Sequence, residues 1–421
     1  MTRRAAALPV GLIALAVVAW AWPLQRLAFY TRRTAAGDVN VYLRYARLMA
    51  RGLVPYRDFH IEYPPGATFI FWLVWQLPGH YRGTLSAVML VCLCICLVGV
   101  VATARALGLS PVRQAIAGGI IALAPLLLGP IVLERFDMAV AAVTAWMIYA
   151  AVTERWRLMW ILLAVGVLIK LVPIALLPLL LIWHAHRRGW TAAIRDAAIS
   201  MGIVVIGILP FAIIAPSGTW YFVGYNLRRP PQLESLTSNL FLLLANYGHY
   251  RFRIVEDYHS NGVHGTGPAV VATISTVVLA IAVVVCAWWS WRLLAGSSPP
   301  ADRGIIVAGA AATIVALTVF GKVLSPQYMM WLLPVTLILQ GRRGRTAVAL
   351  TVLVFLLTLT YFPTHFAEIS KVQIYVIRIL TLRNLALIAL LVVCWPRASS
   401  GRDVATTGAD QAATATPEPV V

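Results

Sequence analysis

Charged side chains are scarce in this sequence of 421 residues, in which Asp, Glu, Lys and Arg make up 12% and hydrophobic residues 61%. A soluble domain carries about twice this charged fraction. Most of the chain therefore cannot face water, which excludes a soluble enzyme and a disordered protein. The net charge of +19 does not indicate a nucleic-acid partner, because a basic excess in a membrane protein reflects topology and contact with anionic lipids.

Lysine and cysteine are rare as well. Only three of the 34 basic residues are lysines, namely Lys170, Lys322 and Lys371, a bias typical of a GC-rich bacterial genome. The five cysteines form no paired motif, and those at 92, 94 and 96 alternate within one apolar run. They are interpreted as small core residues rather than as a disulfide framework or a metal site. The sequence also lacks a Gly-rich nucleotide-binding loop.

Long apolar stretches fill most of the chain. A helical span needs about 20 apolar residues, or fewer inside protein, and such stretches lie at 8–24, 84–104, 113–133, 138–152, 157–183, 193–215, 268–294, 304–320, 323–340, 346–362 and 374–395. The stretch 157–183 has basic residues at both ends and Lys170 and Pro173 at its middle, which predicts two short helices that turn near Lys170. We therefore expect an all-α, polytopic membrane protein of about twelve transmembrane helices.

Short basic connections predict the orientation. Assigned to the cytoplasm, they place both termini inside and the two long hydrophilic segments, 25–66 and 217–267, outside. The short stretch 67–79 is then a juxtamembrane or re-entrant helix on the outer face, and residues 42–51 form an amphipathic helix. A signal peptide at 1–24 is rejected because no small-residue cleavage site follows it. We expect one membrane domain, 1–396, and a disordered cytoplasmic tail, 397–421.

The acids gather on the predicted outer face, which favours an active site there, although loops are often simply solvated. Asp38 follows the first span and is either a general base or the cap of the next helix. Asp58 and Glu62 lie in a proline-rich, rigid turn with Tyr56 and Tyr63, which suits a sugar or a headgroup but also fits a plain turn.

Four further motifs carry charge. Arg135 and Asp137 lie at a helix end and either pair with each other or serve a ligand. Lys170 is alone in an apolar pair of helices, so we expect either Asp137 or an anionic ligand beside it. Arg228 and Arg229 open the second long loop and suit phosphate or carboxylate. Lys322 precedes a predicted helix start whose free N–H groups favour an anion.

The series of motifs resembles glycosyltransferase family 87, a bacterial family of polytopic GT-C enzymes that includes many actinobacterial mannosyltransferases. The resemblance runs from about residue 30 to 365. It is carried by Asp38…Tyr42, Pro55-Tyr56-Arg57-Asp58-Phe59, Glu62-Tyr63-Pro64-Pro65, Arg135-Phe136-Asp137, Lys170-Leu171-Val172-Pro173, Gln232-Leu233-Glu234-Ser235, and Ser325-Pro326-Gln327-Tyr328…Trp331-Leu332-Leu333-Pro334. A usual member has a more polar turn around Lys170.

This resemblance implies an inverting transfer of a sugar, typically mannose, from a polyprenyl-phosphate donor to a glycolipid or glycan hydroxyl outside the bacterial cell membrane. Asp38 would be the catalytic base. The implied phosphate-binding residues are Arg44, Lys170, Arg228, Arg229 and Lys322. The implied sugar or acceptor contacts are Tyr56, Asp58, Glu62, Tyr63, Arg135, Asp137, Gln232, Glu234, Gln327 and Tyr328. No metal and no other cofactor are expected, and membrane lipids are the remaining partners.

Two other functions stay open at this point. A transporter or flippase of lipid-linked sugars would show an inverted repeat and charges near the bilayer midplane, and we find no convincing repeat. An assembly partner in envelope biogenesis would not need Asp38. The sequence does not identify the acceptor, the linkage, or mannose over arabinofuranose or another sugar.

Overall fold

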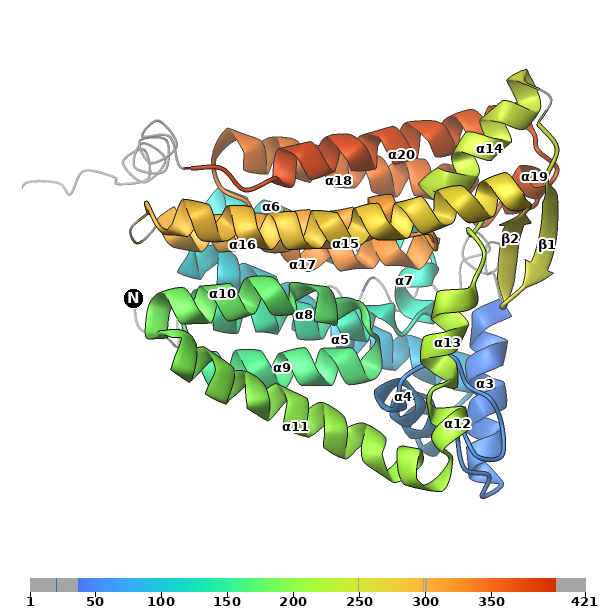
Figure 1. Ribbon diagram of the computed structural model, residues 1–421, viewed down its shortest axis with the longest axis horizontal. Helices are drawn as coiled ribbons and strands as arrows, with labels where there is room; N and C mark the ends of the chain where they lie inside the picture. Colours follow the sequence, from blue (N-terminus) through green and yellow to red (C-terminus); the bar gives the residue numbers. More distant parts are fainter. Residues whose placement is uncertain (1–19, 21–36, 249, 298, 300, 399–421) are drawn as a thin grey trace, which may run out of the picture.

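The computed structural model describes residues 20, 37–248, 250–297, 299 and 301–398. The predicted span 8–24, apart from Trp20, lies outside the described residues, as do residues 25–36 of the first long loop and 399–421 of the tail. The described residues form helices and a single two-stranded sheet (Figure 1).

Seven of the described helices are long and apolar enough to cross a membrane. They are α5 (Tyr81–Ala106), α6 (Pro111–Leu128), α11 (Trp190–Ile214), α15 (Thr266–Leu294), α16 (Ala301–Phe320), α18 (Gly341–Tyr361) and α20 (Ile374–Cys394). Two shorter apolar helices are α8 (Asp137–Val152) and α9 (Trp156–Ile169). These helices coincide with predicted stretches, so the prediction of an all-α polytopic membrane protein is confirmed.

The apolar stretch 157–183 forms two short helices, as predicted. Helix α9 ends where Lys170 adopts an extended backbone (φ −158°, ψ 139°), and the chain returns through the 3₁₀-helix η1 (Val172–Leu176) and α10 (Leu177–Arg188). An ion pair of 2.5 Å joins Arg187 to Glu154. The basic flanks of the pair therefore lie at the same end of the molecule.

The predicted span 323–340 is not one helix. It consists of the 3₁₀-helix η2 (Pro326–Leu332) and the single turn α17 (Leu333–Thr336), because prolines at 326 and 334 lack the N–H that a continuous helix requires. Most of this segment is buried against protein, including Met329, Met330 and Leu332. Irregular backbone at membrane depth is tolerated only in such a protein environment.

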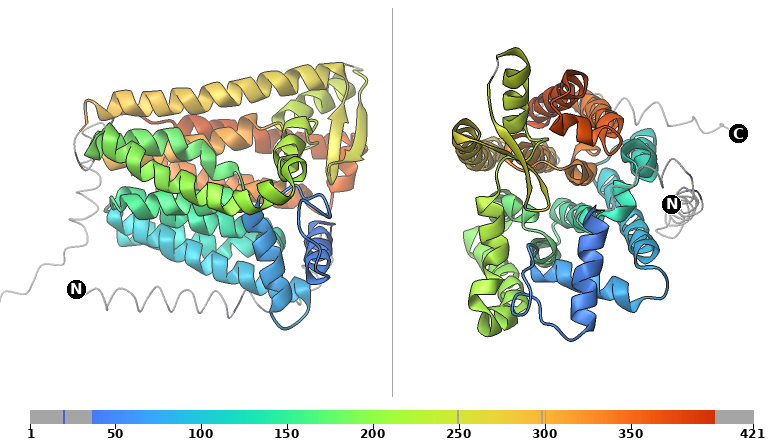
Figure 2. Two further views of the ribbon diagram at one scale, coloured as in Figure 1. Left: turned by 60° about the horizontal axis from the view of Figure 1, so that its bottom comes forward. Right: turned by 90° about the vertical axis from the view of Figure 1, so that its right-hand side faces the viewer.

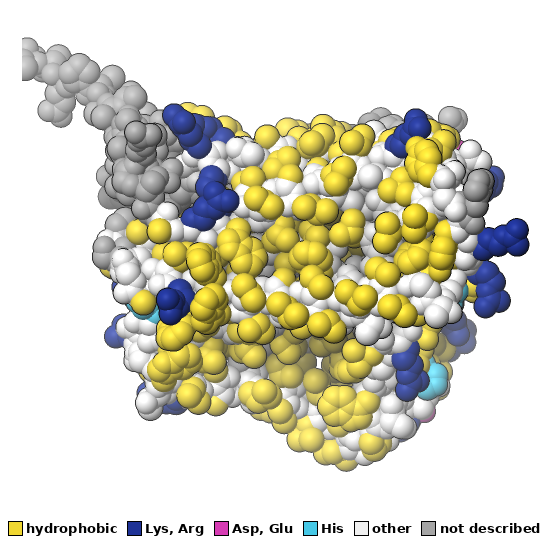
Figure 3. Space-filling model, turned by 45° about the horizontal axis from the view of Figure 1, so that its top comes forward, with side chains coloured by type: hydrophobic (Ala, Val, Ile, Leu, Met, Phe, Trp, Pro, Cys, Tyr) yellow, Lys and Arg dark blue, Asp and Glu magenta, His cyan; other side chains and the backbone are white. Residues whose placement is uncertain are grey.

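The bundle has a packed centre and a lipid-like surface. Helices α8 and α16 are buried along most of their length, whereas α11 and α15 are apolar and have few buried residues. Figure 3 shows the resulting apolar band, with Lys and Arg side chains at its two edges. This pattern is what a chain in a bilayer requires, because its outer surface contacts hydrocarbon.

The described parts of both long hydrophilic segments lie at one end of the bundle, which we call the loop end (Figures 1 and 2). The first segment contributes α3 (Gly37–Ala50), and α4 (Pro65–Gln76) follows it. They correspond to the predicted amphipathic and juxtamembrane helices. The second contributes α12 (Pro216–Thr219), α13 (Tyr221–Arg228), α14 (Leu236–Tyr247) and an antiparallel hairpin of β1 (Arg253–Asp257) and β2 (Ser260–His264). Helix α19 (Phe366–Ser370) also lies there.

The two long segments pack directly on each other. A Cβ atom at Gly218 would lie 1.9 Å from the backbone oxygen of Tyr56, so only glycine permits this approach of α12 to the first segment. The His60 ring also stacks on Tyr221, with 4.6 Å between ring centroids. These contacts hold α12 and α13 against the turn that precedes α4.

Candidate active site

A cavity of about 390 Å³ opens at the loop end, and we call it the polar cavity. It is assembled from α3, the turn before α4, the α9–η1 corner, the segment after α13, the hairpin tip and the segment 321–331. The polar and aromatic side chains that line it are Asp38, Glu62, Tyr63, Lys170, Tyr225, Asn226, Arg229, Gln232, Tyr258, His259, Ser260, Thr276, Lys322, Ser325, Gln327, Tyr328 and Trp331.

Asp38 lies in the first turn of α3 and forms an ion pair with Arg135, with 2.9 Å between Oδ2 and Nε. Arg135 is buried and extended (φ −123°, ψ 132°) between α7 (Ile131–Glu134) and α8. Asp38 keeps 28% of its side chain exposed. The alternative that Arg135 pairs with Asp137 is therefore wrong, and Asp38 is a fixed carboxylate that faces the polar cavity.

Lys170 lies beside Asp137, with 2.6 Å between Nζ and Oδ1. The indole N–H of Trp331 donates to the same oxygen at 2.9 Å. The ammonium group is also about 5 Å from the ring centroids of Phe136, Tyr328 and Trp331, a cation–π arrangement. Of the two expected partners of Lys170, the structure shows Asp137, so the charge of this lysine is largely neutralised within the protein.

Glu62 is buried and accepts a hydrogen bond of 2.5 Å from the Tyr45 hydroxyl. Tyr63 packs edge-on against Phe136, with 5.1 Å between ring centroids. Helix α3, the turn before α4 and the start of α8 thus share one aromatic cluster. This packing holds Glu62 and Tyr63 at the cavity wall.

Two cations on the opposite wall have neutral partners. Arg229 donates to the Ser260 hydroxyl at 2.8 Å, and Lys322 donates to the backbone oxygen of Leu227 at 2.7 Å. Within the described part of the chain, neither forms an ion pair with a carboxylate. Burial and the nearby Arg229 guanidinium lower the pKa of Lys322, because both disfavour its charged form. An anion bound between these residues would relieve that repulsion.

Apolar side chains complete the cavity on its lipid-facing side. They include Ile174 of η1, Leu279 of α15 and Leu317 of α16. Ile174 is 51% exposed although it is hydrophobic. The polar cavity therefore adjoins a surface that contacts hydrocarbon, and a ligand there can combine a polar head with an apolar tail.

Several predicted site residues lie outside the polar cavity. Arg44 is exposed on α3, and the Tyr56 hydroxyl is used in a hydrogen bond to the Tyr63 backbone oxygen at 2.7 Å. Asp58 accepts from Arg57 and from the Val54 N–H, and these bonds lower its pKa to about 2. Asp58 therefore stabilises the turn that contains it and does not contact the cavity.

Arg228 and Glu234 also lie elsewhere. Arg228 lines a neighbouring groove. Glu234 is fully enclosed, where it accepts from the Tyr361 hydroxyl at 2.7 Å and its backbone oxygen accepts from Arg383 at 2.7 Å. Glu234 thus connects the segment after α13 to α18 and α20 rather than contacting a ligand in the cavity.

The sequence did not reveal Tyr258 and His259 at the hairpin tip as site residues. It also did not reveal Arg383 as the partner of Glu234. A hairpin is usually signalled by a turn such as Asn-Gly between alternating strands, and residues 257–260 carry no such signal. Trp331 was part of the motif series but was not assigned to the site. Its indole N–H bond to Asp137 could be found only in three dimensions.

The predicted anion site near Lys322 does not lie at the start of a long α-helix. Residues Pro326–Leu332 make a short 3₁₀-helix, and the Ser325 hydroxyl donates to the Gln327 side chain. A helix of this length has a weak dipole, so side-chain charge dominates here. Among the residues that the structure describes, no group of three His, Cys, Asp or Glu side chains could hold a metal ion.

Comparison with known proteins identifies the family. Glycosyltransferase family 87 matches residues 59–326, more than half of the chain. A search of curated proteins found no match. Among solved structures, the crystal structure of ArnT from Cupriavidus metallidurans bound to undecaprenyl phosphate is similar with a TM-score of 0.48 and 14% identity, over 94% of this chain and 77% of that one. On the sequence match, the chain belongs to glycosyltransferase family 87.

Proposed function

We propose that this glycosyltransferase moves a sugar, mannose in the first instance, from a polyprenyl-phosphate donor to a hydroxyl of a glycolipid or glycan at the outer face of the membrane. The transfer is of the GT-C type and inverts the anomeric centre. Asp38 acts as the general base, and Arg229 and Lys322 bind the donor phosphate.

The reaction is a single displacement. The acceptor hydroxyl oxygen forms a bond to the anomeric carbon, while the bond from that carbon to the phosphate oxygen breaks. The electron pair of the broken bond leaves with the polyprenyl phosphate. The hydroxyl proton passes to the Asp38 carboxylate. The leaving phosphate gains negative charge, which Arg229 and Lys322 stabilise.

The observation that carries this proposal is the charge arrangement of the polar cavity. A carboxylate held by Arg135 lines the same cavity as two cations that have no carboxylate partner among the described residues. A base and a site for phosphate are the two groups that this displacement needs. Lys170, which we expected at the phosphate, is neutralised by Asp137 and is assigned here to holding Tyr328 and Trp331 in place.

The apolar side of the cavity supports a lipid-linked donor. A polyprenyl chain would leave the cavity past Ile174, Leu279 and Leu317 and enter the bilayer, while its phosphate stays with the cations. Glu62, Tyr63, Gln232, Gln327 and Tyr328 remain the candidate sugar contacts, because all of them line the polar cavity. A transporter of lipid-linked sugars is the weaker alternative, because the chain belongs to a glycosyltransferase family.

The test uses the full chain purified into nanodiscs, with radiolabelled polyprenyl-phosphate mannose and octyl α-mannoside as acceptor. We expect transfer by the wild type and its loss in Asp38→Asn. Glu368→Gln is the matched control, because Glu368 lies in α19 at the same end and pairs with His365 rather than lining the cavity. It should keep wild-type transfer.

Two results would contradict the proposal. Unchanged transfer by Asp38→Asn would remove this residue from the mechanism. Transfer from a nucleotide sugar, with none from the lipid-linked sugar, would reject the donor.

A further inference from the structure

A second hollow, which we call the aromatic groove, lies at the loop end beside the polar cavity. It is open to solvent, has a volume of about 800 Å³, and is lined by Ser217, Trp220, Tyr221, Gly224, Tyr225, Arg228, Glu256, Asp257, Tyr258 and His259. One side comes from α12 and α13, and the other from the end of β1 and the hairpin tip. In the end-on view of Figure 2 these elements lie at the loop end, with α3 close by.

The aromatic groove adjoins the polar cavity. Tyr225, Tyr258 and His259 line both hollows. A ligand in the groove therefore lies next to the cavity that Asp38 lines. The groove is open to solvent and therefore suits a water-soluble ligand. The cavity adjoins the lipid-facing surface and therefore suits a lipid-linked ligand.

The hairpin tip between them is strained. Tyr258 and His259 have φ of 49° and 54°, the left-handed values that a two-residue hairpin turn needs and that Asn-Gly usually supplies. Residues with such φ values are strained unless the surroundings hold them. Here the Tyr225 hydroxyl donates to the Tyr258 backbone oxygen at 2.5 Å. The strain thus places two ring side chains where the groove meets the cavity.

The chemistry of the groove fits a neutral, hydroxyl-rich ligand. Trp220 and Tyr221 are 58% and 36% exposed, and the apolar face of a sugar ring packs well on such rings. The stacked His60 ring limits the motion of Tyr221. Arg228, Glu256 and Asp257 bring both signs of charge to the groove, and Asp257 also lies 3.0 Å from His264 Nε2. Such side chains can form hydrogen bonds with hydroxyl groups.

We propose that the aromatic groove binds an oligosaccharide, namely the sugar residues of the acceptor next to the one whose hydroxyl reacts. This inference rests on the proposed function and extends it to the acceptor class. The volume is within the range of about 300–1,000 Å³ that small-molecule sites occupy, which accommodates more than one sugar ring. The enzyme would accordingly prefer an acceptor that already carries a short glycan.

The first experiment compares two acceptors, octyl α-mannoside and the matching octyl manno-trisaccharide, with the full chain in nanodiscs. For the wild type we expect a higher kcat/KM with the trisaccharide. Tyr221→Ala and Glu256→Gln should each lower the ratio of kcat/KM for the trisaccharide to that for the monosaccharide about tenfold, the effect of losing about 1.4 kcal/mol of binding.

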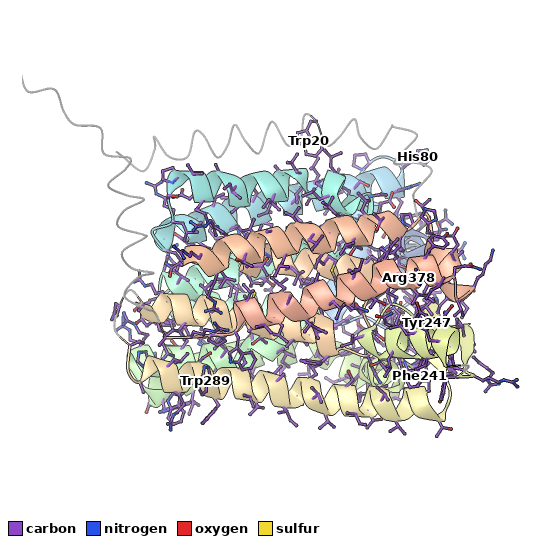
Figure 4. The ribbon with its side chains drawn as sticks, turned by 90° about the horizontal axis from the view of Figure 1, so that it is seen from above. Trp20, His80, Phe241, Tyr247, Trp289 and Arg378 are labelled. Atoms are coloured by element: carbon purple, nitrogen blue, oxygen red, sulfur yellow. The ribbon has the colours of Figure 1, made fainter. Side chains whose placement is uncertain are left out.

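The control is Tyr247→Ala. Tyr247 is an exposed aromatic residue at the end of α14, near Arg378 (Figure 4), and it is not among the groove-lining residues. Its hydroxyl accepts a hydrogen bond of 3.1 Å from Arg378. This variant should keep the wild-type ratio. A ratio that is the same in wild type, Tyr221→Ala and Glu256→Gln would overturn the proposal, as would an equal fall in Tyr247→Ala.

The second experiment separates this proposal from the proposed function. Saturation-transfer NMR measures binding of the free manno-trisaccharide to the wild type without any donor. Binding that is lost in Tyr221→Ala supports the groove even if no transfer from polyprenyl-phosphate mannose occurs. Absence of binding overturns the proposal, and it is the result expected if Trp220 and Tyr221 instead anchor the chain at the membrane interface.

Discussion

Arg135 holds Asp38 through an ion pair of 2.9 Å that joins the start of α8 to the first turn of α3. The arginine is buried, whereas the carboxylate is partly exposed to the polar cavity. Two residues farther on, Asp137 holds Lys170 in the same way. The short sequence Arg135-Phe136-Asp137 therefore fixes two oppositely charged side chains that come from different parts of the chain.

We predict that Arg135 acts on catalysis through Asp38. Arg135→Gln should lower kcat about a hundredfold, because a base displaced by about 1 Å loses that much, while donor KM stays near the wild-type value. The double variant with Asp38→Asn should be no slower than Asp38→Asn alone, since the two residues act as a unit. Arg135→Lys should recover part of the rate. Losses that simply multiply in the double variant would contradict this relationship.

The Asp137–Lys170 pair should matter mainly for stability. Asp137→Asn leaves the partly buried Lys170 ammonium group at the cavity wall without its partner, and it should destabilise the protein by up to about 3–5 kcal/mol, the range for a fully buried pair. The double variant Asp137→Asn/Lys170→Met removes both charges and should recover most of this loss. Thermal unfolding in detergent, followed by tryptophan fluorescence, measures both variants. Equal melting temperatures for the single and double variants would show that the charge of Lys170 is not what destabilises the single one.

Arg229 and Lys322 should determine donor affinity. Arg229→Gln and Lys322→Gln are each expected to raise donor KM about tenfold or more, because charge-assisted bonds to phosphate are stronger than neutral ones. KM for the acceptor should change little. Arg378→Gln is the control, because Arg378 is exposed on α20 beside Tyr247 (Figure 4) and is not among the residues that line the cavity. An unchanged donor KM in both cavity variants would show that Arg229 and Lys322 do not bind the donor phosphate.

Glu234 should make stability depend on pH. Burial raises its pKa to about 7 from the usual 4.5, so the folded protein holds a proton that the unfolded chain releases between these values. Stability from this group is present below pH 4.5 and falls as pH rises through about 7. The melting temperature of the wild type relative to Glu234→Gln should fall over that window. A difference that is constant from pH 4.5 to 7.5 would contradict this origin.

The sidedness of the loop end can be measured directly. Arg51→Cys and Arg345→Cys place single exposed thiols at the loop end and at the start of α18, in a background without the five native cysteines. We expect a membrane-impermeant maleimide to label position 51 in intact cells and position 345 only after lysis. The reverse pattern would place Asp38 in the cytoplasm, where a lipid-linked sugar exposed on the outer face cannot reach it.

Much of the fold could be predicted from local sequence patterns. Apolar length predicted the spans, and the basic flanks with Pro173 predicted the break at Lys170. The same reasoning overestimated the regularity of 323–340, because hydropathy does not report whether a stretch faces lipid or protein. The prolines at 326 and 334 are tolerated there since the segment is buried within the bundle.

The candidate site was predicted only in part. Asp38, Glu62, Lys170, Arg229, Gln232 and Lys322 do line one cavity. Asp58 instead pairs with the neighbouring Arg57, and Glu234 accepts from Tyr361, which is distant in the sequence. The hairpin tip was missed because its turn contains Tyr258 and His259 in place of the usual turn residues.

The sequence alone determined that this chain lies in a membrane, which stretches are apolar enough to form most of its long helices, and which family it resembles. These properties depend on composition, period and short motifs, all of which are local along the chain. Only the tertiary structure decided that Arg135 binds Asp38 and Asp137 binds Lys170, which leaves Arg229 and Lys322 without carboxylate partners in the described part of the chain. Such pairings depend on which helices pack together in the bundle, and buried charges take whichever partner that packing brings within reach.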